Sequence, residues 1–355
     1  MTECILIEDC RSLEAFKKTT ISAFKKTDVM KEFTKCLYQK KLEDAVFFAS
    51  ELFCSGHLLD LWNVILQYAS QYIHYGNPKL PIYLLDRYHT FKDIISTKYI
   101  ENELDSRNDK DIRHLFTEVT YILCFSQIKH ILQPVKIKPE QLQLMEVNHL
   151  MRADNTSYGS VNFIKGDPKE LFIPINEFAY HISHHSHSKH DAIFWMEWIL
   201  SYESNCKKKK HKIECERRTF ANVANSYQTD VIWMLWEIVL DESKRLSPLH
   251  LKIVKSLLDL FSIRYSTGMK RKRRFILYNA IMLICEPFSS KTPISPNGME
   301  EINSARIITR VYKQIKQNEQ KKKDDYLFHG LKDPAKQNRD MTMKKLNIMN
   351  EINTI

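Results

Sequence analysis

Two runs of cations are the side chains in this sequence best suited to binding chemistry. Lys207 to Lys210 precede His211 and Lys212, and a second run follows Gly268. Several cations on one helical turn can contact successive phosphates. A nuclear localisation signal and a solvated helix start are the alternatives, although cations at a helix N-terminus oppose the helix dipole. The candidate nucleic-acid-binding residues are Lys207, Lys208, Lys209, Lys210, Lys270, Arg271, Lys272, Arg273 and Arg274.

The overall charge of the chain also favours an acidic partner. The chain of 355 residues carries a formal net charge of +10, and a positive potential recruits polyanions such as DNA or RNA at long range. An AT-rich coding sequence also produces high Lys, Ile and Asn usage. The charge therefore favours an acidic partner only where the cations cluster.

A group of histidines is the second candidate for chemistry, because imidazole is a common metal ligand. The histidines lie between His181 and His190, and two cysteines follow. The spacing of Cys206, His211 and Cys215 is not a standard zinc pattern, and Ser and Lys separate the histidines. We therefore prefer a solvated His-rich loop. The candidate metal ligands are His184, His187, Cys206, His211 and Cys215.

No motif for catalysis or nucleotide binding is present in the sequence. The seven glycines form no Gly-x4-Gly-Lys-Ser/Thr phosphate loop, and both the serine nucleophile elbow and the His-Glu-x-x-His zinc helix are absent. Paired carboxylates such as Glu101 with Glu103 lie in polar stretches, where nothing would raise their pKa. We predict no catalytic residue and no cofactor.

Cysteine usage and hydropathy indicate the compartment. The eight cysteines are scattered through apolar stretches without the dense spacing of a disulfide framework. The acidic N-terminus does not resemble a signal peptide, and no stretch approaches the roughly 18 apolar residues of a membrane span. We expect a cytoplasmic or nuclear protein with reduced thiols, and a virion-associated protein is the alternative.

The composition favours helices as the elements that carry these side chains. Only 7 glycines and 11 prolines interrupt the chain, fewer than turns in a β-rich fold require. Apolar residues recur at helical spacing. The helices expected in the first part of the chain cover residues 13–33, 44–53, 58–75, 80–88 and 112–125.

An internal duplication is the most informative pattern. The sequence Asp44-Ala45-Val46-Phe47-Phe48 returns as Asp191-Ala192-Ile193-Phe194-Trp195, and Leu61-Trp62 returns as Leu235-Trp236. Leu84-Leu85-Asp86 and the helix at 113–124 have later counterparts in the same order. We predict two similar bundles, each hiding its tryptophans in the core rather than exposing them to stack on bases.

The fold class expected is all-α, with two tandem, similar helical bundles, a short irregular or hairpin connector and a mobile C-terminal tail. The connector holds the only plausible β element, a hairpin of residues 161–167 and 171–173. The predicted boundaries are N-terminal helices at 1–34, a first repeat at 35–130, a connector at 131–180, a second repeat at 181–290, and a C-terminal helix with a basic tail at 291–355.

The first repeat resembles a known helical domain. Asp44-Ala45, Gly56, Tyr68-Ala69-Ser70, Ile73 and Asn77-Pro78 are similar to the C-terminal collar of clamp-loader-related ATPases of the replication-associated recombination protein A branch. Gln71-Tyr72 stands in place of Glu-Asp, and His74 in place of Gly. The family's ATPase module has no counterpart in this sequence. The resemblance implies a stand-alone collar that assembles with itself or with a replication complex.

These patterns lead to one functional hypothesis and two alternatives. We expect a non-enzymatic helical scaffold in a DNA replication or repair complex, with helices for a protein partner or self-association and a basic surface for DNA or RNA. No membrane partner is expected. The alternatives are a viral or other structural protein that neutralises a packaged polyanion, and a metal-dependent enzyme that uses residues 181–215.

Overall fold

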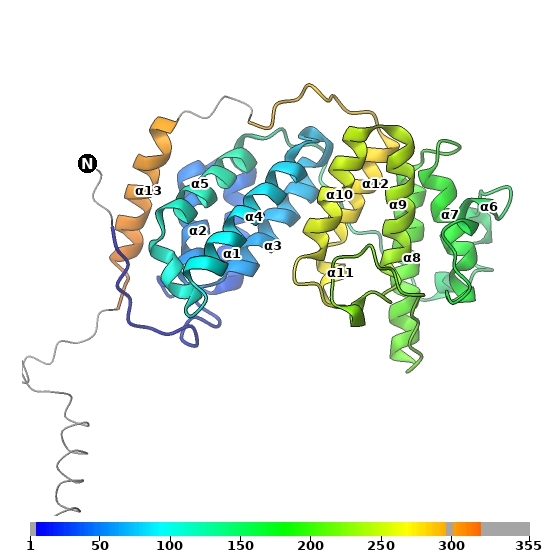
Figure 1. Ribbon diagram of the computed structural model, residues 1–355, viewed down its shortest axis with the longest axis horizontal. Helices are drawn as coiled ribbons and strands as arrows, with labels where there is room; N and C mark the ends of the chain where they lie inside the picture. Colours follow the sequence, from blue (N-terminus) through cyan, green and yellow to red (C-terminus); the bar gives the residue numbers. More distant parts are fainter. Residues whose placement is uncertain (1–4, 296–300, 321–355) are drawn as a thin grey trace, which may run out of the picture.

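The computed structural model describes residues 5–295 and 301–320, and its regular structure there is helical (Figure 1). The only β pairing among these residues is an isolated bridge between Thr19 and Lys25, which confirms the all-α prediction. The predicted hairpin is wrong, because residues 161–167 form turns and irregular chain and residues 171–173 lie in η6 and the start of α7. The predicted tail lies outside the described residues. The short helical elements are η3 (Glu103–Asn108), η4 (Glu140–Leu142), η5 (Asn148–Leu150), α6 (Ser157–Ser160), η6 (Lys169–Leu171) and η7 (Asn225–Tyr227).

Five helices form the first unit: α1 (Lys26–Tyr38), α2 (Leu42–Cys54), α3 (Leu58–Tyr68), α4 (Leu80–Lys98) and α5 (Lys110–Phe125). Helix α2 packs against α1, α3 and α5. Of the entry helix or helix pair predicted over 13–33, helix begins only at Lys26, and residues 13–24 form turns and bends. Phe16 and Ile21 are buried there, so their apolar spacing reflects anchoring of a loop.

The end of α3 is irregular, where one long helix over 58–75 was predicted. The helix widens into a π-helical segment, η1 (Ala69–Ile73), and a 3₁₀ turn, η2 (His74–Gly76). His74 takes a left-handed φ of 34°. A Cβ at Gly76 would overlap the carbonyl oxygen of Gln127, so this close approach of two backbones requires glycine.

The second unit contains α7 (Phe172–Ile182), α8 (Lys189–Lys208), α9 (Ile232–Leu246), α10 (Pro248–Ser262), α11 (Met269–Lys272) and α12 (Arg274–Cys285). Ser188 caps α8 by accepting a hydrogen bond from the Asp191 amide, and Ser247 caps α10 ahead of Pro248. Serine N-caps and proline in the first turn are favourable at helix starts.

Several helix pairings recur in the two units. Helices α1 and α2 pack together as α7 and α8 do, α2 contacts α5 as α8 contacts α12, and α4 contacts α5 as α10 contacts α12. Helix α7 lies inside the segment predicted as connector. Trp62 packs against Tyr88 and Phe91 of α4, while Trp236 packs against Phe261 of α10.

All five tryptophans are buried, which confirms their predicted place in the core. Trp62 and Trp236, the counterparts in the sequence pattern, are each no more than 1% exposed. Burial of these side chains is a large source of apolar stabilisation for each unit. None of them is available to stack on a nucleic-acid base.

The units lie side by side and are joined through packed helices (Figure 1). Helix α10 packs on α4, and α12 contacts α3, η1 and η2. The final described helix, α13 (Glu301–Lys316), returns to the first unit and packs on α2 and α5. Its Arg310 forms an ion pair of 2.7 Å with Glu43.

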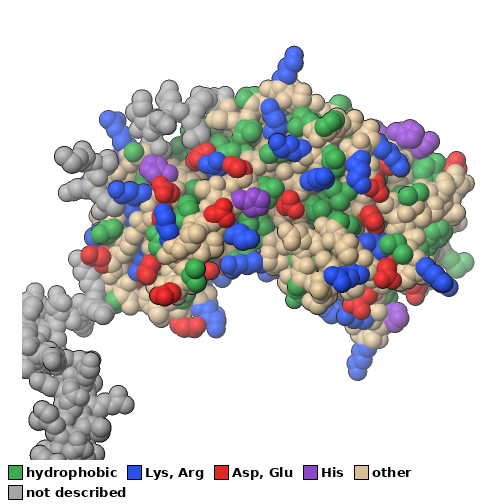
Figure 2. Space-filling model, viewed as in Figure 1, with side chains coloured by type: hydrophobic (Ala, Val, Ile, Leu, Met, Phe, Trp, Pro, Cys, Tyr) green, Lys and Arg blue, Asp and Glu red, His purple; other side chains and the backbone are tan. Residues whose placement is uncertain are grey.

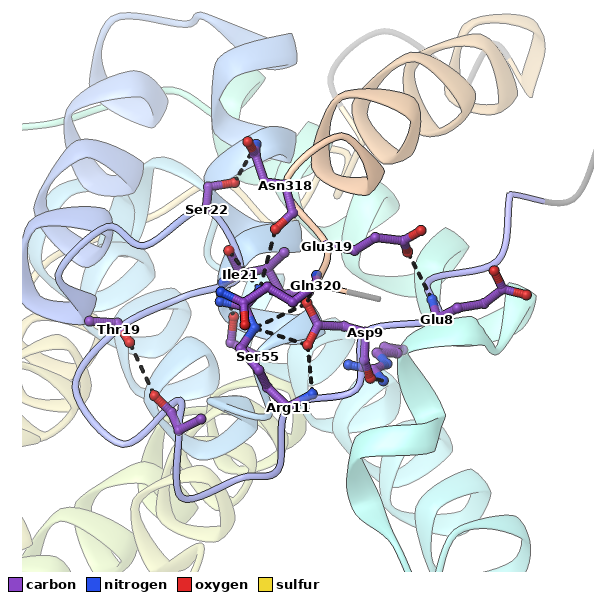
Figure 3. A network of polar contacts seen from close by, with 12 residues as sticks. Glu8, Asp9, Arg11, Thr19, Ile21, Ser22, Ser55, Asn318, Glu319 and Gln320 are labelled. Carbon is purple, nitrogen blue, oxygen red and sulfur yellow. Dashed lines mark hydrogen bonds and ion pairs between the residues drawn. The ribbon is translucent and has the colours of Figure 1, made fainter. Parts of the chain in front are cut away.

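A polar network fastens the N-terminal segment to the residues that follow α13 (Figure 3). Asp9 accepts hydrogen bonds from Arg11 and from the Gln320 amide, and the Cys10 amide donates to the Gln320 carbonyl oxygen. Burial opposes ionisation of Asp9, but the hydrogen bonds outweigh it and hold the pKa of Asp9 below its ordinary value. The two ends of the described chain are thus held together on the first unit.

Candidate nucleic-acid interface

A cavity of about 760 Å³ brings the two basic runs together. It lies between the C-terminal part of α8, the 209–230 segment and the start of α11. Lys207 and Lys210 of the first run and Lys270 and Arg271 of the second all line it. We call it the α8–α11 pocket.

Helix α8 supplies one wall of the pocket. Leu200, Glu203, Ser204 and Lys207 line the cavity, and their spacing of three and four residues places them on one face of the helix. Lys210 then takes a left-handed φ of 61° and turns the chain back. Helix α8 thus presents the partly buried Glu203 and the exposed Lys207 to the same cavity.

The opposite wall comes from the irregular segment between α8 and α9. The Cys215 amide donates to the Thr229 carbonyl oxygen, and Arg218 donates to the carboxylate of Asp167 at 2.7 Å. Arg218 and Asp167 are both buried, and their ion pair anchors the segment on residues that precede α7. The wall is therefore held in place without a helix.

A buried ion triad forms the floor of the pocket. The Lys270 ammonium lies 2.5 Å from a Glu203 oxygen and 2.8 Å from an Asp230 oxygen. The Tyr265 hydroxyl donates to the other Asp230 oxygen at 2.9 Å. The side chain of Lys270 is 8% exposed, so its charge neutralises buried carboxylates and is not available to a ligand at the mouth of the pocket.

The floor carries a local excess of negative charge, because two carboxylates share one ammonium. Burial raises the pKa of Glu203, and the nearby Lys270 counteracts this only in part. Burial and the adjacent Asp230 carboxylate raise the pKa of Tyr265. An anion would be repelled at the floor, and a hydrogen-bond donor would be favoured.

The second basic run, 270–274, does not act as one cationic surface. Besides Lys270, Arg273 is buried and donates to the Phe261 carbonyl oxygen and to Asn63, and burial lowers its pKa to about 10. Arg274 pairs with Glu197 at 3.2 Å. Only Arg271 and Lys272 of this run are exposed.

The lysines of the first run are all exposed. Among the described residues, no carboxylate lies within ion-pair distance of Lys207, Lys208, Lys209 or Lys210, whereas Lys212 pairs with Glu214 at 2.6 Å. In Figure 2, Lys and Arg side chains project at the lower end of the second unit, and Asp and Glu side chains lie among them there and on the rest of this face. The unpaired cations of the pocket mouth are therefore Lys207, Lys210 and Arg271.

The candidate metal ligands are not brought together. Cys206 and Cys215 are buried, and burial raises the pKa of Cys215 to about 12. His184, His187 and His211 are exposed. Across residues 5–295 and 301–320, no three His, Cys, Asp or Glu side chains are grouped so that they could hold a metal ion.

Sequence reasoning missed the pocket residues Glu203, Tyr227 and Asp230. Glu203 precedes Lys207 by four residues on α8, a spacing that marks a shared helix face. This signal could have placed a carboxylate beside the first run. Nothing local in the sequence indicates that Asp230 and Lys270, forty positions apart, would meet.

No helix in the described part of the chain has the length and apolar character needed to cross a bilayer. Comparison with family models, curated proteins and solved structures finds no match.

Proposed function

We propose that this protein is a non-enzymatic helical scaffold that binds nucleic acid at the mouth of the α8–α11 pocket. The observation that carries the proposal is the convergence of Lys207, Lys210 and Arg271 on one cavity, with no carboxylate at ion-pair distance from any of them in the described residues. Cations without a carboxylate partner are free to contact phosphates, and among the described residues Arg271 donates only a long hydrogen bond of 3.4 Å to the Leu200 carbonyl oxygen. Cations already paired with carboxylates would have to break those pairs first.

The location of the free cations favours a defined site over diffuse neutralisation of a polyanion. Basic and acidic side chains alternate over much of the face in Figure 2, and three members of the second run are engaged inside the protein. A protein that only neutralised packaged nucleic acid would benefit from a broad single-sign surface. The virion-component alternative therefore has less support than site-specific binding.

The proposed place in a replication or repair assembly rests on the collar resemblance alone. The residues that carry it, Tyr68 to Ile73, form the end of α3 and η1, and η1 contacts α12 of the second unit. In this chain the segment therefore joins two units of one polypeptide. Mass measurement of the purified protein would show self-association, and co-purification with a polymerase or clamp would support the proposed assembly.

A salt titration tests the nucleic-acid proposal. Anisotropy of a labelled single-stranded oligonucleotide should report binding at low salt, with log K falling as log[salt] rises by about 0.7 per phosphate contact. Three contacts give a slope near −2. The Lys207→Ala, Lys210→Ala, Arg271→Ala triple variant should lose most of the affinity and of the slope.

The matched control removes three exposed lysines that lie away from the pocket, Lys31, Lys92 and Lys136. It changes the net charge by the same amount and should keep most of the affinity. The proposal fails if no oligonucleotide binds at low salt, if binding is indifferent to salt, or if the two triple variants lose affinity equally.

A further inference from the structure

The α8–α11 pocket has a deep end and a mouth of opposite chemistry. Its volume of about 760 Å³ lies in the range of sites that enclose small molecules, and it is too small for a duplex. Glu203 and Asp230 lie at the floor beside Lys270, while Lys207 and Lys210 lie on the exposed side. A matching ligand offers hydrogen-bond donors at one end and negative charge at the other.

Glu203 is the floor residue with acceptor capacity to spare. Asp230 accepts from Lys270, from the Tyr265 hydroxyl and from the Ile232 amide. Among the described residues, both oxygens of Glu203 accept hydrogen bonds from Lys270 alone, and its side chain keeps 17% of its exposure. Since a carboxylate oxygen can accept two hydrogen bonds, Glu203 can still receive donors from a ligand.

An aromatic side chain lies on the wall between these ends. Tyr227 lines the pocket and is half-buried, with its ring edge-on to that of Tyr265 at 5.8 Å between centroids. Unpaired bases commonly stack on tyrosine in single-strand sites. The wall therefore offers an apolar surface to a flat ligand.

We infer that the pocket takes one unpaired nucleotide whose base bears an exocyclic amino group. The amino group donates to Glu203, the base lies along Tyr227, and the flanking phosphates contact Lys207, Lys210 and Arg271. Cytosine, adenine and guanine all bear such a donor, whereas uracil presents a carbonyl oxygen in place of the amino group of cytosine, and Glu203 repels that oxygen. The inference rests on the proposed function, since it assigns the base that enters the same site.

A comparison of cytosine with uracil tests the amino group at constant ring size, because uracil has a carbonyl oxygen in its place and carries a proton on the adjacent ring nitrogen. Oligo(C) and oligo(U) of equal length, as RNA and as the deoxy forms, are titrated at pH 7.5 and fixed salt. Oligo(C) should bind between about 5-fold and 150-fold more tightly. If oligo(C) binds more tightly than oligo(U) by the same factor as RNA and as DNA, the site recognises the base alone. If the difference appears in only one of the two, it also identifies the sugar that the site accepts.

Glu203→Gln should abolish the preference for cytosine and leave the salt slope unchanged. Because Lys270 keeps its pair with Asp230 in this variant, the fold should persist, and a thermal melt checks it. Tyr227→Ala provides the second variant, which should weaken binding of both oligonucleotides without removing the preference.

The outcomes separate this inference from the proposed function. Equal affinity for oligo(C) and oligo(U) with a normal salt slope overturns the base recognition and leaves phosphate binding in place. A preference that survives in folded Glu203→Gln overturns the role of Glu203. No binding of either oligonucleotide at low salt overturns the proposed function as well.

Discussion

Replacement of Lys270 by methionine should destabilise the protein through the charges that it leaves behind. The ammonium is the only cation within ion-pair distance of Glu203 and Asp230 among the described residues. The side chains of Asp230 and Glu203 are 3% and 17% exposed. Removing one partner from a buried ionic cluster typically costs about 3–5 kcal/mol, because the remaining charges stay buried and unpaired.

This loss should depend on pH with a definite sign. Burial raises the pKa of Glu203 above its ordinary 4.5, and removal of Lys270 raises it further. A carboxyl whose pKa is raised by folding costs nothing below the pKa of the unfolded state, and its full penalty appears above the pKa of the folded state. The destabilisation of Lys270→Met should therefore be largest at pH 7–8 and shrink toward pH 5.

Urea unfolding followed by tryptophan fluorescence measures the loss, since all five indoles are buried. Lys272→Met is the matched control from the same basic run, because Lys272 is exposed and should change stability by no more than about 0.5 kcal/mol. A loss under about 1 kcal/mol at pH 7, or an equal loss at pH 5 and pH 8, would refute the structural role of Lys270.

Three further predictions concern the fold. Gly76→Ala should destabilise the protein by about 1–3 kcal/mol because its Cβ overlaps a backbone carbonyl, whereas Gly268→Ala, whose Cβ meets nothing within 4 Å, should be nearly neutral; thermal melts compare the two. Trp62→Ala and Trp236→Ala should each cost about 3–5 kcal/mol, and a small loss at either one would contradict equivalent cores. Asp9→Ala should speed the exchange of backbone amide hydrogens in the residues after α13. In the unmutated protein, the Asp9 carboxylate should stabilise the fold until the pH falls below about 3.8 through its lowered pKa. Unchanged exchange in Asp9→Ala would count against the terminal network.

The helices with strong apolar periodicity could be predicted from the sequence. The helix predicted over 112–125 is observed as α5 (Lys110–Phe125), and the buried faces carry the predicted tryptophans. Pro174 lies in the first turn of α7, where proline is tolerated, so it does not prevent a helix within the predicted connector. Val161, Ile164 and Ile173 suggested strands, but tertiary packing decides the state of such short segments.

The candidate site was predicted only in part. The two basic runs were identified, but the run at 270–274 divides between the interior and the surface. Lys270, Arg273 and Arg274 share a helical spacing of three and four residues, and each meets a buried partner on another element. Those partners are distant in sequence, so composition could not distinguish structural cations from free ones.

Cross-linking tests most directly whether nucleic acid binds at the α8–α11 pocket. Ultraviolet irradiation of the full chain with a single-stranded oligonucleotide, followed by peptide mass spectrometry, identifies the residues in contact. We predict cross-links in residues 200–212, 226–230 and 267–271, with Tyr227 prominent and with loss of the signal at high salt. Cross-links confined to the first unit or to residues 184–190, or a signal indifferent to salt, would contradict the account.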